Sequence, residues 1–505
     1  MRERVGFKRG SAVSVVQTEI DRFLGSSAVP LYVGGSWTPA RGGAAFEVRQ
    51  PADGSVLAVV ASGDGADIDD AVTAATRAFP EWAGRSANER ATLLHRYADA
   101  IEASAEVLAN LESLDVGKPV KDATGFDVPF AAKAFRYFAD LSVNVRRSQP
   151  LPVEHIEARQ VQVPYGPCGF IFPWNFPFLL YAWGVAPALA AGNTVVVKPA
   201  ELTPLSTLYA CHLAAQVGIP AGVVNVVPGL GRTAGAALSQ HSGIRRMSFT
   251  GSPEVGRAVA QEAARNLVPC KLELGGKGAA VIFDDVDVGD TARKLAGAIT
   301  LNTGQVCCTA TRWFVHQNVL DELVSEASKA LSEISIGPGD DEATTMGPLV
   351  SETQRQRVLG YVDKGISTGA TALLEGGAVR PEGHEGGYYV RPMLLAGGPD
   401  NVCAKEEIFG PVAYVIPFRD EQTVIGSVNS SRYGLANSVW SGDLDRANRV
   451  AERLEAGNSW INAHNVFAYG LPYGGVNLSG YGGGVNSPET LFDYLRHQTI
   501  ARPLS

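Results

Sequence analysis

The chain has 505 residues, with 43 lysines and arginines against 52 aspartates and glutamates, so its formal net charge is −9. At roughly 150 residues per domain, this length predicts two or three domains. Charged residues make up 19% and hydrophobic residues 45% of the chain, which excludes a disordered or collagen-like protein. The acidic balance, without any run of lysine and arginine, argues against nucleic acid or an anionic membrane as the partner and favours a small molecule.

Glycine and cysteine are the informative residue types. The 56 glycines are about 11% of the chain, against a typical ~7%, and they predict tight turns and close approaches to a ligand, with flexible connections as the alternative. The six cysteines are too sparse for a disulfide framework and match no zinc spacing, so we expect a reducing, cytoplasmic compartment and no metal centre.

The N-terminus carries basic residues in MRERVGFKRG but no apolar stretch after them, which argues against a secretory signal. No apolar run approaches the ~18 residues that a membrane span needs. Residues 1–25 are expected to form a loosely attached extension.

Helical spacing of apolar residues opens the folded part of the chain. It predicts a helix from Ile68 to Phe79, a longer one over about 88–114 that ends before Gly117 and Pro119, and a third over about 128–143. Polar and apolar residues then alternate over 150–165, which predicts an exposed antiparallel hairpin of the kind that pairs with another subunit.

Short β-branched runs next alternate with helical patterns. Strands are expected in TVVVKP from residue 194, in VVNVVPG from residue 223, and through Met247 and Phe249. A helix is expected over 203–217, with Thr203 as its cap and Pro204 in its first turn.

A second series of strand candidates follows Lys277: AAVIF, RWFVH, AYVIPF, NSVW and NSWIN. Strands that alternate with helices indicate βαβ units and parallel sheets buried on both faces. The sequence therefore predicts an α/β fold with two domains and a boundary near Gly276.

The first candidate for chemistry is the pair Cys307 and Cys308 in the string NTGQVCC. A thiolate is a strong nucleophile, but it needs a lowered pKa or an adjacent base, and neither follows from the local string. Taken alone, the pair is more typical of inert, buried cysteines.

Two further strings could serve a reaction. In LELGGK, burial could raise the pKa of the Glu273 carboxyl toward that of a general base, although an ordinary surface glutamate in a turn is favoured by this string alone. In FPWNFP, two prolines could aim the Asn175 carboxamide at a developing oxyanion, with a rigid turn as the alternative.

Glycine-rich turns suggest a nucleotide cofactor. The string from Gly229 through Gly231 to Gly235 only superficially imitates a dinucleotide fingerprint. In FTGSPEVG a strand ends at Gly251 and Ser252 and opens a helix whose free amides could hold a pyrophosphate. Lys198 and Glu201, at the end of TVVVKP, could bind ribose hydroxyls or could form a surface ion pair.

Six motifs stand in one order: PWNFP at 173–177, KPAE at 198–201, FTGSPEVG at 249–256, LELGGK at 272–277, GQVCC at 304–308 and EEIFGPV at 406–412. Together they resemble the aldehyde dehydrogenase superfamily, and the resemblance extends from about residue 30 to the C-terminus. It implies a Rossmann-like cofactor domain, an α/β catalytic domain and a small β oligomerisation flap, in a homodimer or homotetramer.

The implied organisation is an N-terminal extension over 1–25 and an NAD-binding domain over 26–144 and 166–276. The catalytic domain would cover 277–485, and the flap would combine 145–165 with 486–505.

By the same resemblance, Cys307 is the nucleophile that forms a thiohemiacetal and then a thioester. Its oxyanion would be held by Asn175 and the Cys307 N–H, and Glu273 would activate the water that releases a free acid, because CoA-acylating relatives lack that glutamate.

The resemblance also implies cofactor and substrate positions. Glu407 and Phe409 match residues at the nicotinamide riboside, and Glu201 matches the acid that binds the adenine ribose, which favours NAD over NADP. The implied cofactor-binding residues are Trp174, Lys198, Glu201, Gly231, Gly251, Ser252, Gly256, Glu407 and Phe409. Trp183, Phe467 and Tyr473 match tunnel positions and predict an apolar, medium-chain or aromatic aldehyde.

One departure is visible after Pro472. Many relatives carry Ser-Gly-x-Gly-Arg-Glu there, but this chain has Gly483 and Gly484 at the Arg and Glu positions. A relay through that second carboxylate is absent, so Glu273 is expected to carry deacylation alone. A Cys307-dependent hydrolase without a cofactor, an NADP-preferring member and a non-catalytic binding protein are the competing interpretations.

Overall fold

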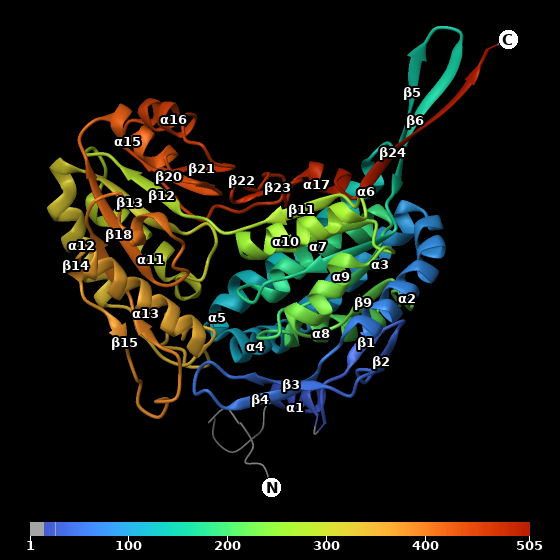
Figure 1. Cartoon of the computed structure of the whole chain (residues 1–505), viewed down its shortest axis with the longest axis horizontal. Coiled ribbons are helices and arrows are strands. Elements are labelled where there is room, and N and C mark those ends of the chain that lie inside the picture. Colours follow the sequence, from blue (N-terminus) through green and yellow to red (C-terminus); the bar gives the residue numbers. More distant parts are fainter. Residues whose placement is uncertain (1–14, 26, 505) are drawn as a thin grey trace.

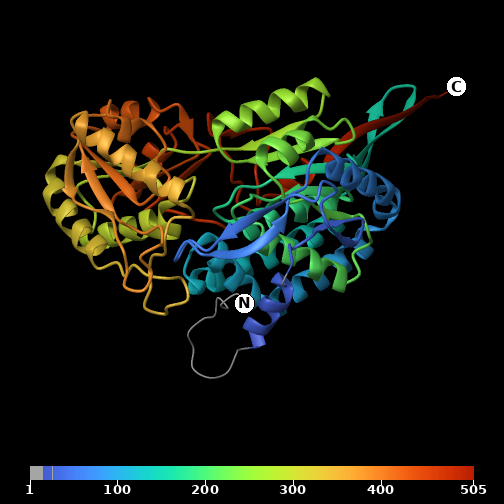
Figure 2. The same cartoon turned by 60° about the horizontal axis from the view of Figure 1, so that its bottom comes forward.

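The computed structural model describes residues 15–25 and 27–504. Two α/β lobes lie side by side, and a narrow arm of three strands projects from the first lobe (Figures 1 and 2). The α/β class expected from the sequence is confirmed. No helix of the described residues is both long and apolar enough to cross a membrane.

The first lobe is built on an eight-stranded sheet with the order β2-β1-β9-β8-β7-β10-β11-β23. Its five central strands run parallel, and they include the three strand regions expected between residues 194 and 250. The strands are β1 (Leu31–Val33), β2 (Ser36–Thr38), β7 (Pro167–Ile171), β8 (Thr194–Lys198), β9 (Val224–Val226), β10 (Arg246–Thr250), β11 (Cys270–Glu273) and β23 (Gly480–Tyr481).

Helices connect and cover these strands, and a separate hairpin runs along the base of the lobe (Figure 1). The connecting helices are α7 (Pro177–Ala191), α8 (Leu205–Gln216), α9 (Ala236–Gln240) and α10 (Pro253–Arg265). The helices that precede them are α2 (Gly65–Gly84), α3 (Ala87–Ala103), α4 (Ala105–Val116), α5 (Val120–Asp122) and α6 (Val128–Asn144), and the hairpin is β3 (Ala45–Arg49) with β4 (Val56–Ala61).

The second lobe is built on a seven-stranded sheet with the order β14-β17-β18-β13-β12-β20-β21, parallel except for β14. The five strands expected after Lys277 are confirmed. The strands are β12 (Gly278–Ile282), β13 (Ala310–His316), β14 (Thr371–Leu374), β17 (Met393–Ala396), β18 (Val412–Phe418), β20 (Ala436–Trp440) and β21 (Asn458–Ile461). The helices are α11 (Val288–Thr300), α12 (Leu320–Ser332), α13 (Glu352–Ser367), α14 (Val402–Lys405), α15 (Glu421–Asn429), α16 (Leu444–Ala451) and α17 (Pro488–Phe492), of which α17 lies beside the first lobe (Figure 1).

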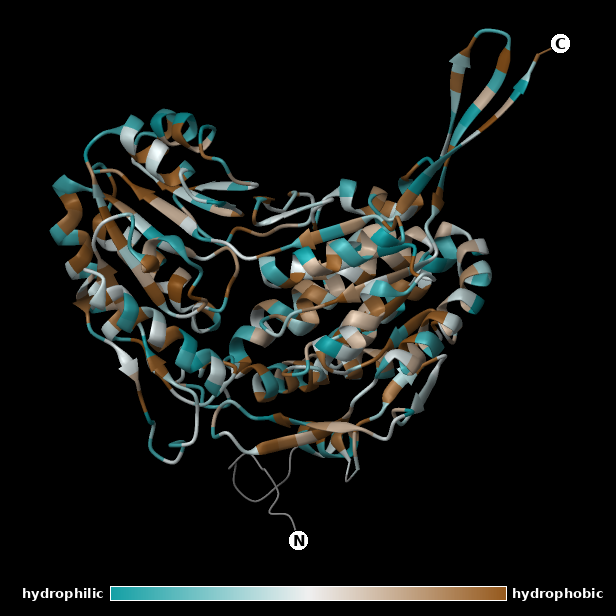
Figure 3. Cartoon of the chain, viewed as in Figure 1, coloured by the Kyte–Doolittle hydropathy of each residue, from teal (hydrophilic) through white to brown (hydrophobic). Residues whose placement is uncertain are grey.

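The arm is a three-stranded antiparallel sheet. The hairpin of β5 (Ser148–Val153) and β6 (Ile156–Pro164) pairs with the C-terminal strand β24 (Leu495–Pro503). Hydrophilic and hydrophobic residues alternate along these strands (Figure 3), and most of them are exposed. The role of the arm in oligomerisation and the residue boundaries of the domains stay predictions.

Three local expectations were wrong. Residues Val15–Leu24 of the expected loose extension form helix α1, whose Ile20 is buried in the main core; residues 1–14 lie outside the described residues. The helix expected over 88–114 is broken at Ser104, whose N–H donates back to the preceding turn. Thr203 does not cap α8, because its hydroxyl donates to the Trp174 carbonyl, and Asp115 accepts from the Leu205 N–H instead.

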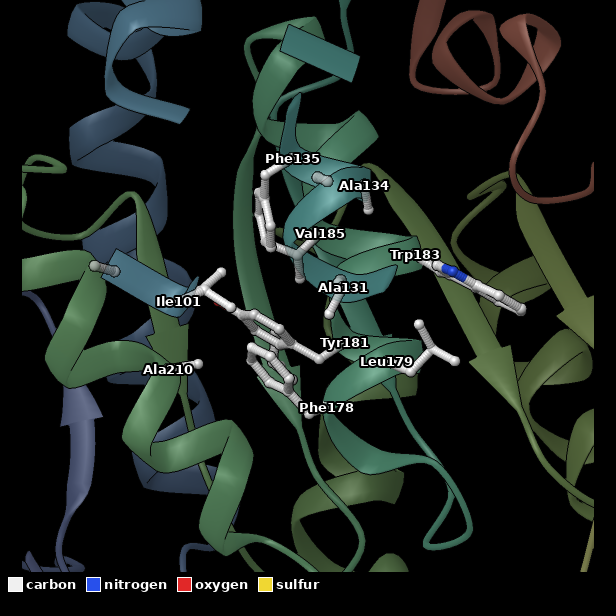
Figure 4. Close-up of a cluster of buried hydrophobic side chains, with 14 of the residues drawn as sticks. Ile101, Ala131, Ala134, Phe135, Phe178, Leu179, Tyr181, Trp183, Val185 and Ala210 are labelled. Carbon is white, nitrogen blue, oxygen red and sulfur yellow. The ribbon is translucent and has the colours of Figure 1, made fainter. Parts of the chain in front are cut away.

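Helix α7 lies at the centre of the first lobe and is apolar on all sides, which is typical of a fully buried helix. Phe178, Tyr181 and Val185 point toward the helices that carry Ile101, Phe135 and Ala210 (Figure 4). Leu179 and Trp183 point to the other side of the helix (Figure 4), where they line a cavity. The core of the lobe therefore holds one wall of that cavity in place.

Candidate active site

The strand order of the first sheet determines where a ligand can bind. The chain moves outward from β7 to β8 and β9, and then returns to the other side of β7 as β10 and β11. Ligands of open α/β sheets bind at the carboxyl ends of strands where the order reverses. Phe172–Asn175 follow β7, Gly251 and Ser252 follow β10, and Glu273 ends β11, so three of the predicted motifs lie at this edge.

A cavity of about 390 Å³ opens at this edge and is lined by residues of both lobes. It brings together eleven of the fifteen predicted site residues. These are Trp174, Asn175, Trp183, Gly251, Ser252, Glu273, Cys307, Glu407, Phe409, Phe467 and Tyr473. Residues more than 290 positions apart in the sequence therefore face one space.

The loop that carries Cys307 is held in an unusual backbone conformation. Asn302, Thr303 and Gly304 have φ angles of 46°, 57° and 71°, in the left-handed region that costs energy for residues with a side chain. A side chain at Gly304 would overlap the backbone of Gly410. Two hydrogen bonds of the Gln305 side chain stabilise the loop: Nε2 donates to the Asn302 carbonyl, and Oε1 accepts from the Val350 N–H. The loop is therefore fixed before any ligand binds.

Cys307 is half-buried, and its Sγ lies 3.4 Å from the Tyr473 hydroxyl. A hydrogen bond from the neighbouring Cys308 thiol, together with the one from Tyr473, lowers the pKa of Cys307 despite burial. The same interaction and burial raise the pKa of Cys308. Of the two adjacent cysteines, Cys307 is therefore the one disposed to ionise, which the local sequence left open.

Asn175 is 4% exposed, and its side chain is held by the loop that carries Cys307. Its Nδ2 donates to the Gln305 backbone carbonyl at 3.0 Å, and the backbone carbonyl of Asn175 accepts from Asn302 Nδ2 at 2.9 Å. A carboxamide NH₂ carries two N–H groups, so the second remains to donate to a ligand in the cavity.

Glu273 is buried at the end of β11, with 7% of its surface exposed. Neither of its carboxylate oxygens has a hydrogen-bond partner among the described residues. Burial raises the pKa of Glu273 to about 8, against the opposing effect of Lys271. This is the protonation behaviour that a general base near neutral pH requires, and it is not the ordinary surface glutamate that the string alone favoured.

Glu407, Phe409 and Trp174 lie together in the cavity lining, in a part that we call the Glu407–Phe409 end. Glu407 Oε1 accepts from the Gly276 N–H at 2.8 Å, and a side chain at Gly275 would overlap the Glu407 carboxylate. The rings of Phe409 and Trp174 meet edge to face with centroids 5.2 Å apart. Burial raises the pKa of Glu407 to about 7.

A second group of predicted residues lies together beyond the cavity lining. Lys198 Nζ is 2.9 Å from Glu201. Burial opposes the ionisation of Glu201, but Lys198 and the Gly231 N–H overcome it and lower its pKa. Glu201 therefore carries a negative charge at the carboxyl end of β8. Gly231 begins a π-helical turn, Gly231–Gly235, rather than the helix of a dinucleotide fingerprint.

Ser252 and Gly256 belong to the start of α10. The Ser252 hydroxyl accepts from the Val255 N–H, and Pro253 is the first helical residue. A side chain at Gly256 would overlap Leu274, so this glycine lets the helix lie close to the end of β11. A helix N-terminus favours an anion.

These groups fit a dinucleotide. An ammonium and a carboxylate suit a ribose diol at one end, the α10 N-terminus suits a pyrophosphate, and Glu407 can accept from a second ribose beside Phe409. Metal ligation is a different matter: within residues 15–25 and 27–504, no group of three histidine, cysteine or acidic side chains is arranged to hold an ion.

Trp183, Phe467 and Tyr473 form an aromatic wall on the remaining side. Their ring centroids are 5.4 to 5.9 Å apart. Phe126 adds a fourth ring 6.1 Å from Phe467. The wall leads from the surface of α7 to the Cys307 sulfur.

Sequence reasoning missed several residues of the site. Phe126 carried no signal, because it lies in a helical stretch far from the motifs. Gln354 and Arg357 of α13 donate to the backbone of Phe409 and Glu407, across 55 and 50 positions of the chain. Lys271 could have been found from strand alternation, because it lies two residues before Glu273 and shares its face of β11.

Comparisons with known proteins agree with this geometry. The model of the aldehyde dehydrogenase family matches residues 37–500. The mitochondrial aldehyde dehydrogenase of Leishmania tarentolae is 40% identical over 454 residues, which are 90% of this chain and 90% of that protein. An NAD⁺ complex of the Bacillus cereus aldehyde dehydrogenase is 38% identical with a TM-score of 0.93, over 96% of this chain and 99% of that one. PnpE from Pseudomonas sp. WBC-3 is 39% identical with a TM-score of 0.92, over 95% and 98%. The resemblance inferred from the six motifs is confirmed, and the chain belongs to the aldehyde dehydrogenase family.

Proposed function

We propose that this protein oxidises an aldehyde to the carboxylic acid and transfers the hydride to NAD. The observation that carries this proposal is the cavity itself. It places a thiol of lowered pKa, an unpartnered buried carboxylate and a carboxamide donor between an aromatic wall and the Glu407–Phe409 end. A solved relative of this size is an NAD⁺ complex, which supports the choice of cofactor.

The Cys307 thiolate would add to the aldehyde carbon. The negative charge moves to the aldehyde oxygen, where the free N–H of the Asn175 carboxamide and the Cys307 backbone N–H can donate to it. Preorganised donors of this kind stabilise a developing oxyanion without reorganisation cost. The hydrogen bonds between Asn175 and the loop that carries Cys307 hold the carboxamide donor in a fixed position relative to the sulfur.

Bound NAD would supply the hydride acceptor, and loss of the hydride from the thiohemiacetal carbon would leave a thioester on Cys307. Lys198, Glu201 and the start of α10 would hold its adenosine and pyrophosphate, and Glu407 its second ribose. The negative charge of Glu201 opposes a 2′-phosphate, which favours NAD over NADP. A cofactor-free hydrolase would have no use for this second group of residues.

Glu273 would then release the acid. Its carboxylate takes a proton from a water molecule, and the hydroxide adds to the thioester carbonyl. The C–S bond breaks, and the Cys307 thiolate leaves. A base of this kind contributes about 10²- to 10⁴-fold to a rate, and the unpartnered oxygens of Glu273 are free to hold the water.

We expect an apolar or aromatic aldehyde as substrate. Burying an apolar side chain is worth about 1.5–3 kcal/mol, so kcat/KM for benzaldehyde and hexanal should exceed that for the cationic 3-aminopropanal by at least about tenfold. The measurement is the steady-state formation of NADH across this panel.

Trp183→Ala is the matched variant for this panel. It should lower kcat/KM for benzaldehyde and hexanal more than for acetaldehyde, because acetaldehyde has only one methyl group to bury. A higher kcat/KM for 3-aminopropanal than for the two apolar aldehydes would contradict the proposed substrate class.

Tyr473→Phe should shift the ionisation of Cys307 to higher pH, because it removes one hydroxyl donor from the sulfur. A hydrogen bond is worth about 0.5–1.5 kcal/mol, so alkylation by iodoacetamide near neutral pH should slow by about 2- to 10-fold. The measurement is the pH profile of alkylation in the absence of NAD. Phe467→Leu changes the same wall without removing a hydroxyl and should leave the profile in place. An unchanged profile in Tyr473→Phe would show that the hydroxyl does not act on the thiolate.

A further inference from the structure

Lys271 is a buried lysine beside the proposed base. It is 2% exposed and lines the same cavity as Glu273. Cys270 and Leu272 of the same strand point into the core on the other face, whereas Lys271 and Glu273 share the cavity face. Two residues along a strand span about 6.6 Å. The Glu273 oxygens have no hydrogen-bond partner among the described residues, so a proton can pass between the two side chains only through a bridging water molecule.

The Lys271 ammonium is held by the segment in which this chain departs from its relatives. Its Nζ donates to the Gly484 carbonyl at 3.2 Å and lies 5.6 Å from the centroid of the Tyr494 ring. The N–H of Gly484 faces the Asp493 carboxylate. The two backbone groups of one glycine thus join a lysine and an aspartate.

Gly483 makes room for this arrangement. A side chain at Gly483 would overlap the carboxylate of Asp493, so any larger residue would displace it. Asp493 is half-buried, and its Oδ2 has no hydrogen-bond partner among the described residues. This oxygen is therefore free to take up a proton.

A general base needs a way to lose the proton that it gains in each turnover. Glu273 is enclosed and, within the described part of the chain, accepts no hydrogen bond through which a proton could leave. We propose that Lys271 is the positioning residue that takes up this proton, and that Asp493 passes it to solvent. This inference rests on the proposed function of Glu273.

The proton count is balanced at every step. Glu273 holds one proton from the attacking water after the thioester has been hydrolysed. The Lys271 ammonium gives a proton, through a second water molecule, to the Asp493 carboxylate, which releases it to the solvent. The Glu273 proton then passes through the bridging water to the neutral Lys271 amine. The carboxylate and the ammonium are both restored, and one proton has left.

The charges around the pair suit such a transfer. Burial lowers the pKa of Lys271 to about 8 and raises that of Glu273 to about 8, so a proton can move between them at little cost. Burial also raises the pKa of Asp493. The other charged or titratable groups that act on the three are Arg246, Glu489 and Cys307.

Deacylation can be tested without the cofactor by using p-nitrophenyl acetate. An activated ester acylates Cys307 directly and produces the same kind of thioester without a hydride step. The burst of p-nitrophenol reports acylation, and the following steady rate reports deacylation. The wild type, Lys271→Met, Asp493→Asn and the control Cys270→Ala, which alters the opposite face of β11, are compared over a range of pH.

In Lys271→Met we expect an unchanged burst, a steady rate about 10- to 100-fold lower, and a deacylation midpoint moved to higher pH, because Glu273 loses its nearest cation. Asp493→Asn is isosteric and should lower the steady rate by at least about threefold, with an unchanged burst. Cys270→Ala should behave as the wild type.

A Lys271→Met protein with the wild-type steady rate and midpoint would overturn the proposal. The proposal would also be overturned if the burst and the steady rate of Lys271→Met fell together while the pH midpoint stayed unchanged, because this pattern indicates loss of structure. Wild-type rates in Asp493→Asn would overturn the proton exit even if Lys271→Met failed to fold. Failure of the proposed function is distinguishable, because the wild type itself would then show no burst.

Discussion

Cys307→Ser should abolish NADH formation from every aldehyde of the panel, with a loss of at least about 10³-fold. A serine hydroxyl stays protonated near neutral pH, whereas the Cys307 thiol has a lowered pKa. The exchange of sulfur for oxygen changes the side-chain volume little, so the fold should persist. The measurement is steady-state NADH formation, with the thermal midpoint as a check of folding.

Cys308→Ser is the matched control for this variant. The Cys308 thiol contacts the Asn465 carboxamide at 3.4 Å, and its pKa is raised, so it should not react. A serine at 308 keeps a donor for the Cys307 sulfur, and the variant should retain at least about a third of the wild-type rate. If Cys308→Ser lost the activity and Cys307→Ser kept it, the assignment of the nucleophile would be wrong.

Much of this site could be predicted because its motifs follow sheet strands. Phe172–Asn175, Gly251–Ser252 and Glu273 come directly after or at the end of parallel strands, and the carboxyl ends of such strands meet at one edge of a sheet. The α/β class and the strands followed from the same alternation of β-branched runs and helical spacing. Local sequence patterns were therefore sufficient to predict the site residues that lie at the ends of neighbouring strands.

The remaining features depend on tertiary structure. The break at Ser104 and the burial of helix α1 follow from packing that no local pattern expresses. The choice between Cys307 and Cys308 depends on Tyr473, which is more than 160 positions away. Only the structure shows why particular positions need glycine: a side chain at Gly275 or Gly483 would overlap the carboxylate of Glu407 or Asp493.

Glu273→Gln should give a rapid burst of about one NADH per active site, followed by turnover about 10²- to 10⁴-fold slower than in the wild type. Glutamine keeps the shape of the side chain but cannot accept a proton, so the thioester forms and is not hydrolysed. The measurement is stopped-flow NADH formation followed by the steady-state rate. Normal turnover in this variant would show that Glu273 is not the base.

The pH dependence separates this explanation from simple disruption of the site. In the wild type, deacylation should rise with pH and level off above about pH 8, because Glu273 must be ionised to act and its pKa is raised to about 8. Glu273→Gln lacks this titration, so its residual steady rate should not show that rise. A rise with the same midpoint in the variant would mean that another group titrates.

As pH rises toward 8, the stability of the folded wild-type protein should fall while its deacylation rate increases. Because the folded-state pKa of Glu273 lies above that of the unfolded chain, ionisation destabilises the folded protein as pH rises from the ordinary range of a glutamate to about 8. Glutamine removes this cost, so the thermal midpoint of Glu273→Gln should exceed that of the wild type by an amount that grows over this range and then levels off. Equal thermal midpoints of the wild type and Glu273→Gln at high pH would show that Glu273 is not buried in the way the structure describes. The expected difference means that the carboxylate needed for catalysis lowers the stability of the folded wild-type protein.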